Sequence, residues 1–507
     1  MKFFDDVDFV VDESIWGHRL YDEQLPHLIF LEFLGILASQ REHALTETSG
    51  QVSYKPQRQL RLRGVLFNNP YIASIAASKN KSDAAKWEQW LSKYTEGAAG
   101  GDDVSYLKTV FSSFDDFARV VELLQSSAFE VNSNKRWSSK FVFPFGPDAL
   151  YEDLRVDAKG SASNDRRFFA RTGELLYLML CRATRKNELK TLLLSRLLDA
   201  KAPLNRLVKT IQGDTEFAAQ EKIIESGHLP LASHSRFDQI CDDWIHILKQ
   251  DMPAYDAIQY LMTSVGLNLM LYFLERSKEI LADDQPVHML CEIVSKDRTK
   301  IRTLSSDDFQ YNQNLSLRAV SAAIASVQSQ AEWLDAADAD YPETEYIRLM
   351  KLRFQWPTPD EENQSWTPDK LIQRLTDKAQ ARHNQHLAKV HATWSKAIGL
   401  SSRRLSRRTR YAPNDHFLKC LVIMVVERRM QFDDFLSEIH RRYGLVIGET
   451  QGQALIENNQ LDQEALSRNS EYLAARLSSL GLLRQLSDGC AFVENPFSPQ
   501  GDDVASE

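Results

Sequence analysis

The chain is poor in the residues that build tight turns and thiol sites. Only 20 of its 507 residues are glycine, where about 7% is usual in globular proteins, and this scarcity favours long helices. The five cysteines are widely separated and form no CxxC pair, which argues against a thiolate metal site or a redox pair. They are Cys181, Cys241, Cys291, Cys420 and Cys490. Isolated thiols in odd number are typical of a reducing compartment, so we expect a cytoplasmic protein with buried, unreactive cysteines.

Motifs that bind phosphates or carry a catalytic nucleophile are also missing. The sequence contains no GxxxxGK[ST], no GxGxxG and no GxSxG pattern, which argues against ATP hydrolysis and against an α/β-hydrolase nucleophile. One minimal nuclease-like pattern, Glu188-Leu189-Lys190, lies in a helical run without a neighbouring strand, so we do not interpret it as an active site. We therefore assign no catalytic residues, no cofactor and no metal.

No hydrophobic run is both long and uninterrupted. The most apolar window, Ala257–Leu274, is broken by Gln259, Ser264 and Asn268. A bilayer-spanning helix needs about 20 nearly uninterrupted apolar residues, so this window predicts a buried core helix. The chain opens with an acidic run where a secretory leader needs cations. We expect neither a leader nor contact with a membrane.

What the sequence does contain is helical periodicity. Apolar residues recur at spacings of three and four along most of the chain. The fold class that we expect is mainly α: a multi-helical protein with a C-terminal winged-helix-like domain and few short β-strands. The polar stretch 157–165 indicates a linker. We therefore expect a mixed, mostly helical domain at 1–156, a helical domain at 166–400, a basic helix with the winged-helix-like domain at 401–497, and a disordered acidic tail at 498–507.

The last hundred residues follow the element order of a winged helix. Three helices are predicted: an apolar one capped by Asn414 or its neighbour, a second at Phe432–Tyr443 and a third at Gln463–Leu480. Residues 482–486 and 490–493 flank an Asp-Gly turn and predict a β-hairpin.

On the third of these helices, Arg468, Tyr472 and Arg476 project opposite a stripe of leucines. In a DNA-binding winged helix this surface enters the major groove, where such side chains contact phosphates and arginine reads guanine. Many winged helices serve only as protein-binding modules, however, and Glu471 on the same side weakens the positive potential. Both interpretations stay open, because function follows from the site rather than from the fold.

A run of arginines before this module contrasts with the net charge of −9. Its members are Arg403, Arg404, Arg407, Arg408 and Arg410. On a helix they share one face, with Tyr411 at its centre. We predict that this basic strip binds nucleic acid through phosphates, with a steep salt dependence. The alternative is a solvated face that pairs with acids from elsewhere in the chain.

The polar stretch Ile372–Ile398 is expected to form one long helix that leads to the basic strip. His383, His386 and His391 lie on it, but they do not share a face and no neighbouring acid completes a metal site. We interpret all three as solvated side chains.

Three stretches carry a resemblance to a known group of proteins. They are Asp12–Leu37 (DESIWGHRLYDEQLPHLIFLEFLGIL), Arg136–Gly146 (RWSSKFVFPFG) and Phe169–Ala183 (FARTGELLYLMLCRA). In style they resemble uncharacterised proteins encoded beside ATPases and helicases in bacterial anti-phage DNA-restriction islands. The resemblance implies a helical accessory subunit that works with motor or nuclease partners. It carries over no catalytic residue.

These observations lead to one functional expectation and two alternatives. We expect a non-catalytic DNA-binding or scaffolding accessory subunit of a bacterial anti-phage defence complex. Its partners would be DNA and protein subunits such as an ATPase, a helicase or a nuclease. The alternatives are a nuclease whose site is assembled from residues distant in sequence, and a pure protein scaffold. Carboxylates covering the arginines in the fold would favour the scaffold.

Overall fold

The computed structural model describes residues 9–18, 20–40, 43–46, 53–54, 65–66, 71–97, 103–126, 154–156, 162–164, 171–213, 224–225, 228–294, 300–356, 367–403, 408–487 and 490–498. These residues are mainly helical with few short strands, which confirms the expected fold class at this level. Apart from Ser498, the expected acidic tail lies outside the described residues.

The chain forms two compact units, each assembled from non-contiguous segments. Unit 1 comprises residues 1–30, 170–189 and 227–507, and unit 2 comprises residues 31–169 and 190–226. The domain boundaries drawn from the sequence stay predictions. One local expectation is wrong, because part of the linker forms a strand. The strands β2 (Leu154–Val156) and β3 (Ala162–Asn164) pair antiparallel.

Unit 2 contains a cluster of packed aromatic rings. Trp87 and Trp90 of α5 (Asp83–Gly97) lie against Phe114 and Phe117 of α7 (Phe114–Ser126). The other elements of this unit are α4 (Ile72–Ala76), α6 (Leu107–Val110), α10 (Pro203–Gln212), and the paired strands β1 (Ser53–Tyr54) and β4 (Ile224–Glu225). The helices α2 (Pro26–Gln40) and α9 (Lys186–Arg196) begin in unit 1 and end in unit 2.

Unit 1 is organised around α12 (Ala254–Ile280), a helix buried along most of its length. It contacts α1 (Val10–Trp16), α11 (Ser235–Lys249), α13 (Lys300–Ala325) and α17 (Val390–Ala397), and α8 (Thr172–Cys181) packs on α11. Among the described residues α12 is long and apolar enough to cross a membrane, but 94% of its apolar window is buried inside the protein. The expected core helix is confirmed.

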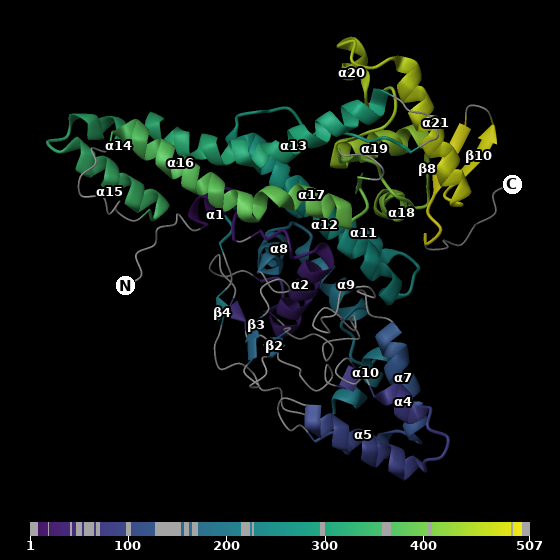
Figure 1. Ribbon diagram of the computed structural model, residues 1–507. Helices are drawn as coiled ribbons and strands as arrows, with labels where there is room; N and C mark the ends of the chain where they lie inside the picture. The colour runs from purple at the N-terminus through teal and green to yellow at the C-terminus, as the bar shows by residue number, and fades with distance from the viewer. Residues whose placement is uncertain are drawn as a thin grey trace. The chain divides into compact units, whose positions relative to one another are not determined.

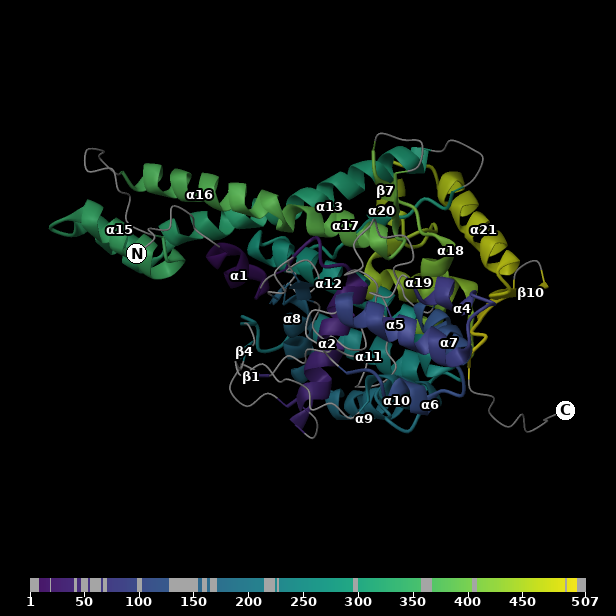
Figure 2. The ribbon, with the colours of Figure 1, turned by 60° about the horizontal axis from the view of Figure 1, so that its bottom comes forward.

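A helical arm extends from this core (Figures 1 and 2). Its outward path consists of α13, η4 (Ser326–Ser329), α14 (Ala331–Asp335) and η5 (Ala336–Asp338). The path then continues through α15 (Pro342–Phe354) and returns along α13 as α16 (Pro368–Gln385). We call the end that carries α14, η5 and α15 the arm tip.

The prediction of a single helix at Ile372–Ile398 is wrong. The helix α16 ends at Gln385, and η6 (Leu387–Lys389) separates it from α17. The break falls at His386, whose φ of −135° and ψ of −59° are not helical. This residue instead turns its ring toward Asp22, with Nδ1 and Oδ1 3.0 Å apart.

The C-terminal part of unit 1, which we call the C-terminal module, contains the three expected helices and the expected hairpin. Its elements are α18 (Asp415–Val425), β8 (Arg429–Gln431), α19 (Phe432–Tyr443), β9 (Leu445–Val446), α20 (Gln453–Glu457), α21 (Gln463–Ser479), β10 (Leu483–Ser487) and β11 (Cys490–Glu494). The strand β8 adds to the hairpin, so that the sheet is antiparallel in the order β10-β11-β8.

Candidate nucleic-acid interface

The described arginines of the basic strip, Arg403, Arg408 and Arg410, are not helical. The short strand β6 (Ser401–Ser402) precedes the strip and pairs antiparallel with β7 (Arg410–Tyr411), which contains its last arginine. The predicted helical face is therefore wrong. Tertiary contacts are the reason, because both backbone polar groups of Tyr411 bond to Ser305 of α13, at 3.1 Å each. A helix through this point would lose those hydrogen bonds.

Arg410 lies inside the protein. Its Nε donates to Glu292 Oε2, while Arg302 Nε donates to the other oxygen of the same carboxylate at 2.7 Å. Arg410 is 5% exposed and Glu292 is 2% exposed. A charge at such a position must be paired to be tolerated. We therefore withdraw Arg410 as a nucleic-acid contact, because a buried and paired guanidinium cannot reach a phosphate.

Tyr411 is a core residue rather than a surface aromatic. Its hydroxyl accepts from Asn312 Nδ2 at 2.8 Å and lies 2.8 Å from His391 Nε2. Burial raises the pKa of Tyr411 and lowers the pKa of His391 to about 3. Both groups are therefore neutral, and the phenol can donate to the imidazole. Tyr411 is withdrawn as a contact as well.

Two cations of the strip face the solvent. Arg403 is exposed, and Arg408 Nη1 lies 3.2 Å from Asp307 Oδ1 with both side chains more than half exposed. Ion pairs between exposed groups contribute only about 0–1 kcal/mol, so Arg408 can exchange its carboxylate for a phosphate. Arg404 and Arg407 lie outside the described residues.

Helix α21 presents the other predicted contacts. Its leucine stripe is buried, and Arg468 lies on the exposed side. The Arg468 guanidinium pairs with Glu464 one turn earlier, and both side chains are well exposed, at 60% and 73%. Arg476 donates from Nε to Asp415 Oδ1 at 2.6 Å and is only 25% exposed. Arg468 is therefore the more accessible of the two arginines.

Not every side chain of this surface favours a polyanion. Tyr472 is half-buried and Glu471 is exposed. Over residues 415–494 carboxylates outnumber lysines and arginines. The module alone is therefore acidic, and any attraction for phosphates depends on cations that other parts of the fold place beside it.

One buried amide fixes how α21 sits on the rest of unit 1. Asn469 Nδ2 donates to the carbonyls of Cys291, at 3.0 Å, and Ile447, at 2.9 Å. Its Oδ1 accepts from the backbone nitrogen of Ile293 at 2.9 Å. The segment between α12 and α13 also contributes β5 (Met289–Leu290), which pairs parallel with β9. The module is thus joined to the helical core.

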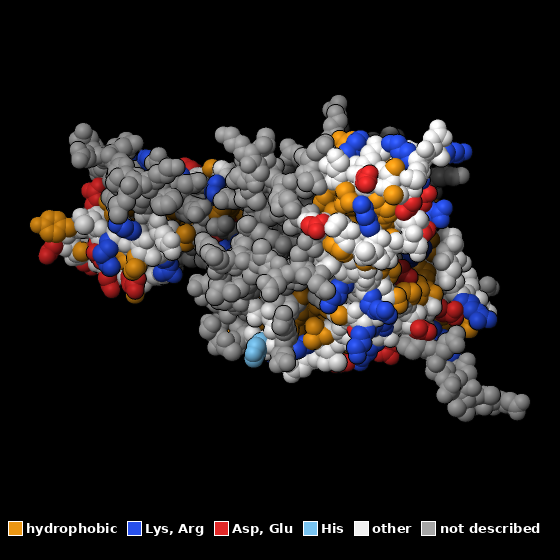
Figure 3. Space-filling model, turned by 90° about the horizontal axis from the view of Figure 1, so that it is seen from below, with side chains coloured by type: hydrophobic (Ala, Val, Ile, Leu, Met, Phe, Trp, Pro, Cys, Tyr) orange, Lys and Arg blue, Asp and Glu red, His pale blue; other side chains and the backbone are white. Residues whose placement is uncertain are grey.

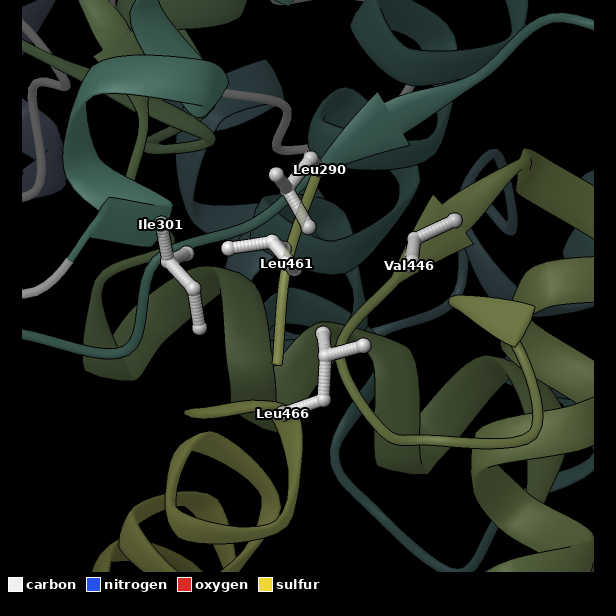
Figure 4. Packing of buried hydrophobic residues seen from close by; sticks show 5 residues of the cluster. All are labelled: Leu290, Ile301, Val446, Leu461 and Leu466. Atoms are coloured by element: carbon white, nitrogen blue, oxygen red, sulfur yellow. The ribbon is translucent and has the colours of Figure 1, made fainter. Parts of the chain in front are cut away.

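The first turn of α13 lies beside the first turn of α21. Ile301 packs with Leu461 and Leu466 in a buried cluster that also contains Leu290 and Val446 (Figure 4). This packing places two cations near α21. Neither was assigned to the site from the sequence. They are Lys300, which is exposed, and Arg302, which is partly exposed.

The same turns of α13 also hold the end of the basic strip. Ser306 Oγ donates to the carbonyl of Thr409 at 2.9 Å, and Asp307 pairs with Arg408. A local signal for this site existed in the sequence, because residues 296–302 alternate cations with other residues. Its closeness to Arg408 could not be predicted, because about a hundred positions separate the two segments in the sequence.

The histidines expected to be solvated are mostly buried. His383 is fully buried, with Nδ1 2.9 Å from Asp12 Oδ1 and Nε2 2.9 Å from Ser316 Oγ. The interpretation of His383 and His391 as solvated side chains is wrong. Helical periodicity could not indicate that these histidines are buried, because their partners come from α1 and from β7, which are far away in the sequence.

The Asp12, His383 and Ser316 side chains have the order of a Ser-His-Asp catalytic triad. All three are buried, at 5%, 0% and 1% exposure. Trp16 stacks on the imidazole with ring centroids 5.4 Å apart. A nucleophile must touch its substrate, and Ser316 sits in the interior of a long helix with no exposed surface. We interpret this chain of hydrogen bonds as a structural link between α1, α13 and α16.

Other described side chains that could act in catalysis or bind a metal are also paired or buried. Glu188, of the nuclease-like pattern, pairs with Lys249 and Arg185, which lower its pKa. Four cysteines are buried and Cys490 is partly exposed, and burial raises the pKa of Cys241 to about 12. Among the described residues no group of three or more His, Cys, Asp or Glu side chains could hold a metal ion.

Comparison with models of known protein families gives a match. Residues 362–494, which include α16, α17 and the C-terminal module, match the family model described as "Methylation-associated defense system protein MAD7". The matched segment is similar to this family of defence-system proteins, which confirms the resemblance drawn from other stretches of the sequence. Searches of curated proteins and of solved structures found no match.

Proposed function

We propose that this chain is a non-catalytic component of a defence system, and that its C-terminal module is a winged helix that holds duplex DNA. One observation carries the proposal: the helix α18 and the strand β8 are followed by α19, the short strand β9, α20, α21 and a hairpin, and β8 completes the hairpin's sheet. In this arrangement one helix projects away from the sheet and can enter the major groove. The helix in question is α21. A defence-system component is expected to act with protein partners in a complex.

The proposed contacts are the accessible cations on and beside α21. Arg468 would approach the duplex from the helix itself, and Arg484 is exposed on β10 of the hairpin. Arg403, Arg408 and Lys300 would follow the phosphates along the neighbouring edge. Each phosphate contact releases condensed counterions. Because the module is acidic, we expect these few cations to supply nearly all of the attraction.

The test is an anisotropy titration of the full-length protein with a labelled duplex of about 25 base pairs, at salt concentrations between about 50 and 200 mM. Arg468→Gln and Arg408→Gln should each weaken binding and lower the slope of log K against log salt by about 0.9. The matched control is Arg348→Gln, since Arg348 also sits on an exposed helix face and pairs with a glutamate of its own helix. Equal affinity and slope in all variants would exclude this interface.

A second candidate function is a protein-binding winged helix. The observation in its favour is that carboxylates already hold both arginines of α21, Glu464 for Arg468 and Asp415 for Arg476. If this function is correct, the wild-type protein shows no measurable duplex binding even at low salt. The same titration therefore decides between the two.

A further inference from the structure

The arm tip carries large apolar side chains that are exposed within the described part of the chain. Among the large hydrophobic residues of the described chain, Tyr341 and Leu352 are the most exposed, at 77% and 70%, and Leu334 follows at 58%. All three belong to α14, α15 and the turn between them. Single exposed apolar residues are common on soluble proteins, but a group at the end of a projecting element marks a contact surface.

The tip has its own small core, so these exposed residues are not a sign of poor packing. Trp333 is 5% exposed and packs on Tyr346 with ring centroids 4.5 Å apart. Leu349, Met350 and Phe354 are also buried. The inner faces of α14 and α15 are therefore satisfied, and the residues that remain point outward.

Three carboxylates lie in the sequence between the exposed residues Leu334 and Tyr341. They are Asp335, Asp338 and Asp340, all of which are exposed. Within the described chain none of the three forms an ion pair. By contrast, Leu352 lies between Lys351 and Arg353. Figure 3 shows hydrophobic side chains beside Asp and Glu side chains at this end of the molecule.

We propose that the acidic, apolar end of the arm tip, formed by residues 334–341, docks a basic segment of another protein of the same defence system. Charge decides the class of partner. Nucleic acid and anionic lipid both carry negative charge and would be repelled by the three aspartates. A lysine-rich segment that carries an apolar anchor satisfies both features, since its cations pair with the carboxylates while the anchor covers Tyr341 and Leu334.

This inference rests on the proposed role in a defence system but not on DNA binding by the C-terminal module, so either proposal can fail alone. The experiment uses the tagged full-length protein, co-expressed with the other proteins encoded in its defence locus and purified as a complex. A zero-length carbodiimide crosslinker then joins carboxylates to lysines, and mass spectrometry identifies the linked residues. We expect crosslinks from Asp335, Asp338 or Asp340 to lysines of one partner protein.

Two variants and a matched control make the result specific. One variant combines Leu334→Ser with Tyr341→Ser, and the other replaces all three aspartates with asparagine. Each should reduce the amount of partner protein that copurifies by about tenfold or more. This corresponds to about 1.4 kcal/mol of binding free energy. Leu352→Ser removes a comparably exposed apolar group from the cationic end of α15 and should leave retention unchanged.

Three outcomes would overturn the proposal. They are the absence of any tip crosslink to another protein, crosslinks only to a second copy of this chain, and equal loss of the partner in the Leu352→Ser control. Duplex binding measured on the same variants should stay at the wild-type level. A parallel loss of DNA binding would show that the substitutions damage the whole fold.

Discussion

The guanidinium of Arg410 and the carboxylate of Glu292 form an ion pair in the interior of unit 1, 118 positions apart in the sequence. This pair joins the end of the arginine-rich stretch to the segment that leads into α13. Removing Arg410 leaves the buried Glu292 carboxylate with Arg302 as its remaining ion-pair partner, so we expect a cost at the lower end of the about 3–5 kcal/mol that breaking a buried ion pair incurs. We therefore expect Arg410→Met to lower the free energy of unfolding by that amount in urea titrations followed by tryptophan fluorescence.

The control for this prediction lies two residues away. Arg408 is 68% exposed and pairs with an exposed aspartate, so Arg408→Met should cost less than about 1 kcal/mol. Similar losses in the two variants would mean that Arg410 is not a buried structural residue.

Two glycines with the same backbone conformation should respond differently to alanine. Gly444 and Gly481 have φ values of +69° and +71°, where an L side chain is strained by about 1–2 kcal/mol. A Cβ on Gly444 would lie 2.1 Å from the carbonyl oxygen of Val287, whereas a Cβ on Gly481 would meet nothing within 4 Å. Gly481→Ala should therefore cost about 1–2 kcal/mol. Gly444→Ala should cost clearly more, because the backbone of the preceding segment must move. Thermal melts of both proteins measure the difference, and equal melting temperatures would contradict it.

The buried Ser316 should be chemically inert. A fluorophosphonate probe labels activated serines, and we expect no labelling of the native protein, because Ser316 is inaccessible and lies in the interior of a helix. His383→Ala should instead lower stability by about 2–4 kcal/mol, since it opens a cavity and leaves Asp12 without its partner. The matched control is His386→Ala, whose side chain is 25% exposed and which should cost less. Stoichiometric labelling that disappears in Ser316→Ala would establish a hydrolase site.

The neutral His391 should make the protein acid-sensitive. Its folded pKa is about 3, below the ordinary value of 6.5. Between these pH values the unfolded chain binds a proton at this residue and the folded chain does not, so stability falls as the pH drops through this window. The contribution is about 1.4 kcal/mol per pH unit. We expect His391→Gln to flatten the dependence of unfolding free energy on pH between pH 6 and pH 4, relative to wild type.

The control for that experiment is His43→Gln, because His43 is exposed. It should reproduce the wild-type slope. Burial also lowers the pKa of His234, His246 and His416, so some acid sensitivity should persist in the His391 variant. An unchanged slope after His391→Gln would show that the imidazole is not held neutral.

Local signals in the sequence were sufficient for the helices and the hairpin of the C-terminal module. The leucine stripe of α21, the cap at Asn414, whose Oδ1 accepts from the backbone nitrogen of Phe417 at 2.8 Å, and the Asp-Gly turn act over a few residues, so they can be recognised without the fold. The core helix α12 was predicted for the same reason, since a long apolar window in a chain of this size has to be buried.

The candidate site could be predicted only in part. Five arginines in eight residues give a high local charge, and the sequence alone indicates no more than that. Whether each guanidinium faces solvent depends on carboxylates elsewhere in the chain. The buried carboxylate of Glu292 pairs with Arg410 inside the protein, whereas Arg408 pairs with an exposed aspartate. The same limit applies to His383, whose partners Asp12 and Ser316 come from two other helices.

By itself, the sequence determined the helical character, the apolar core helix and the element order of the C-terminal module, because those properties depend on neighbours within a few positions. The tertiary structure alone decided which cations remain accessible, how the first turn of α13 meets α21, and which apolar residues the arm tip leaves uncovered. Burial and ion pairing arise from contacts between distant segments, and the energy of a charge or an apolar side chain depends on what those segments place around it.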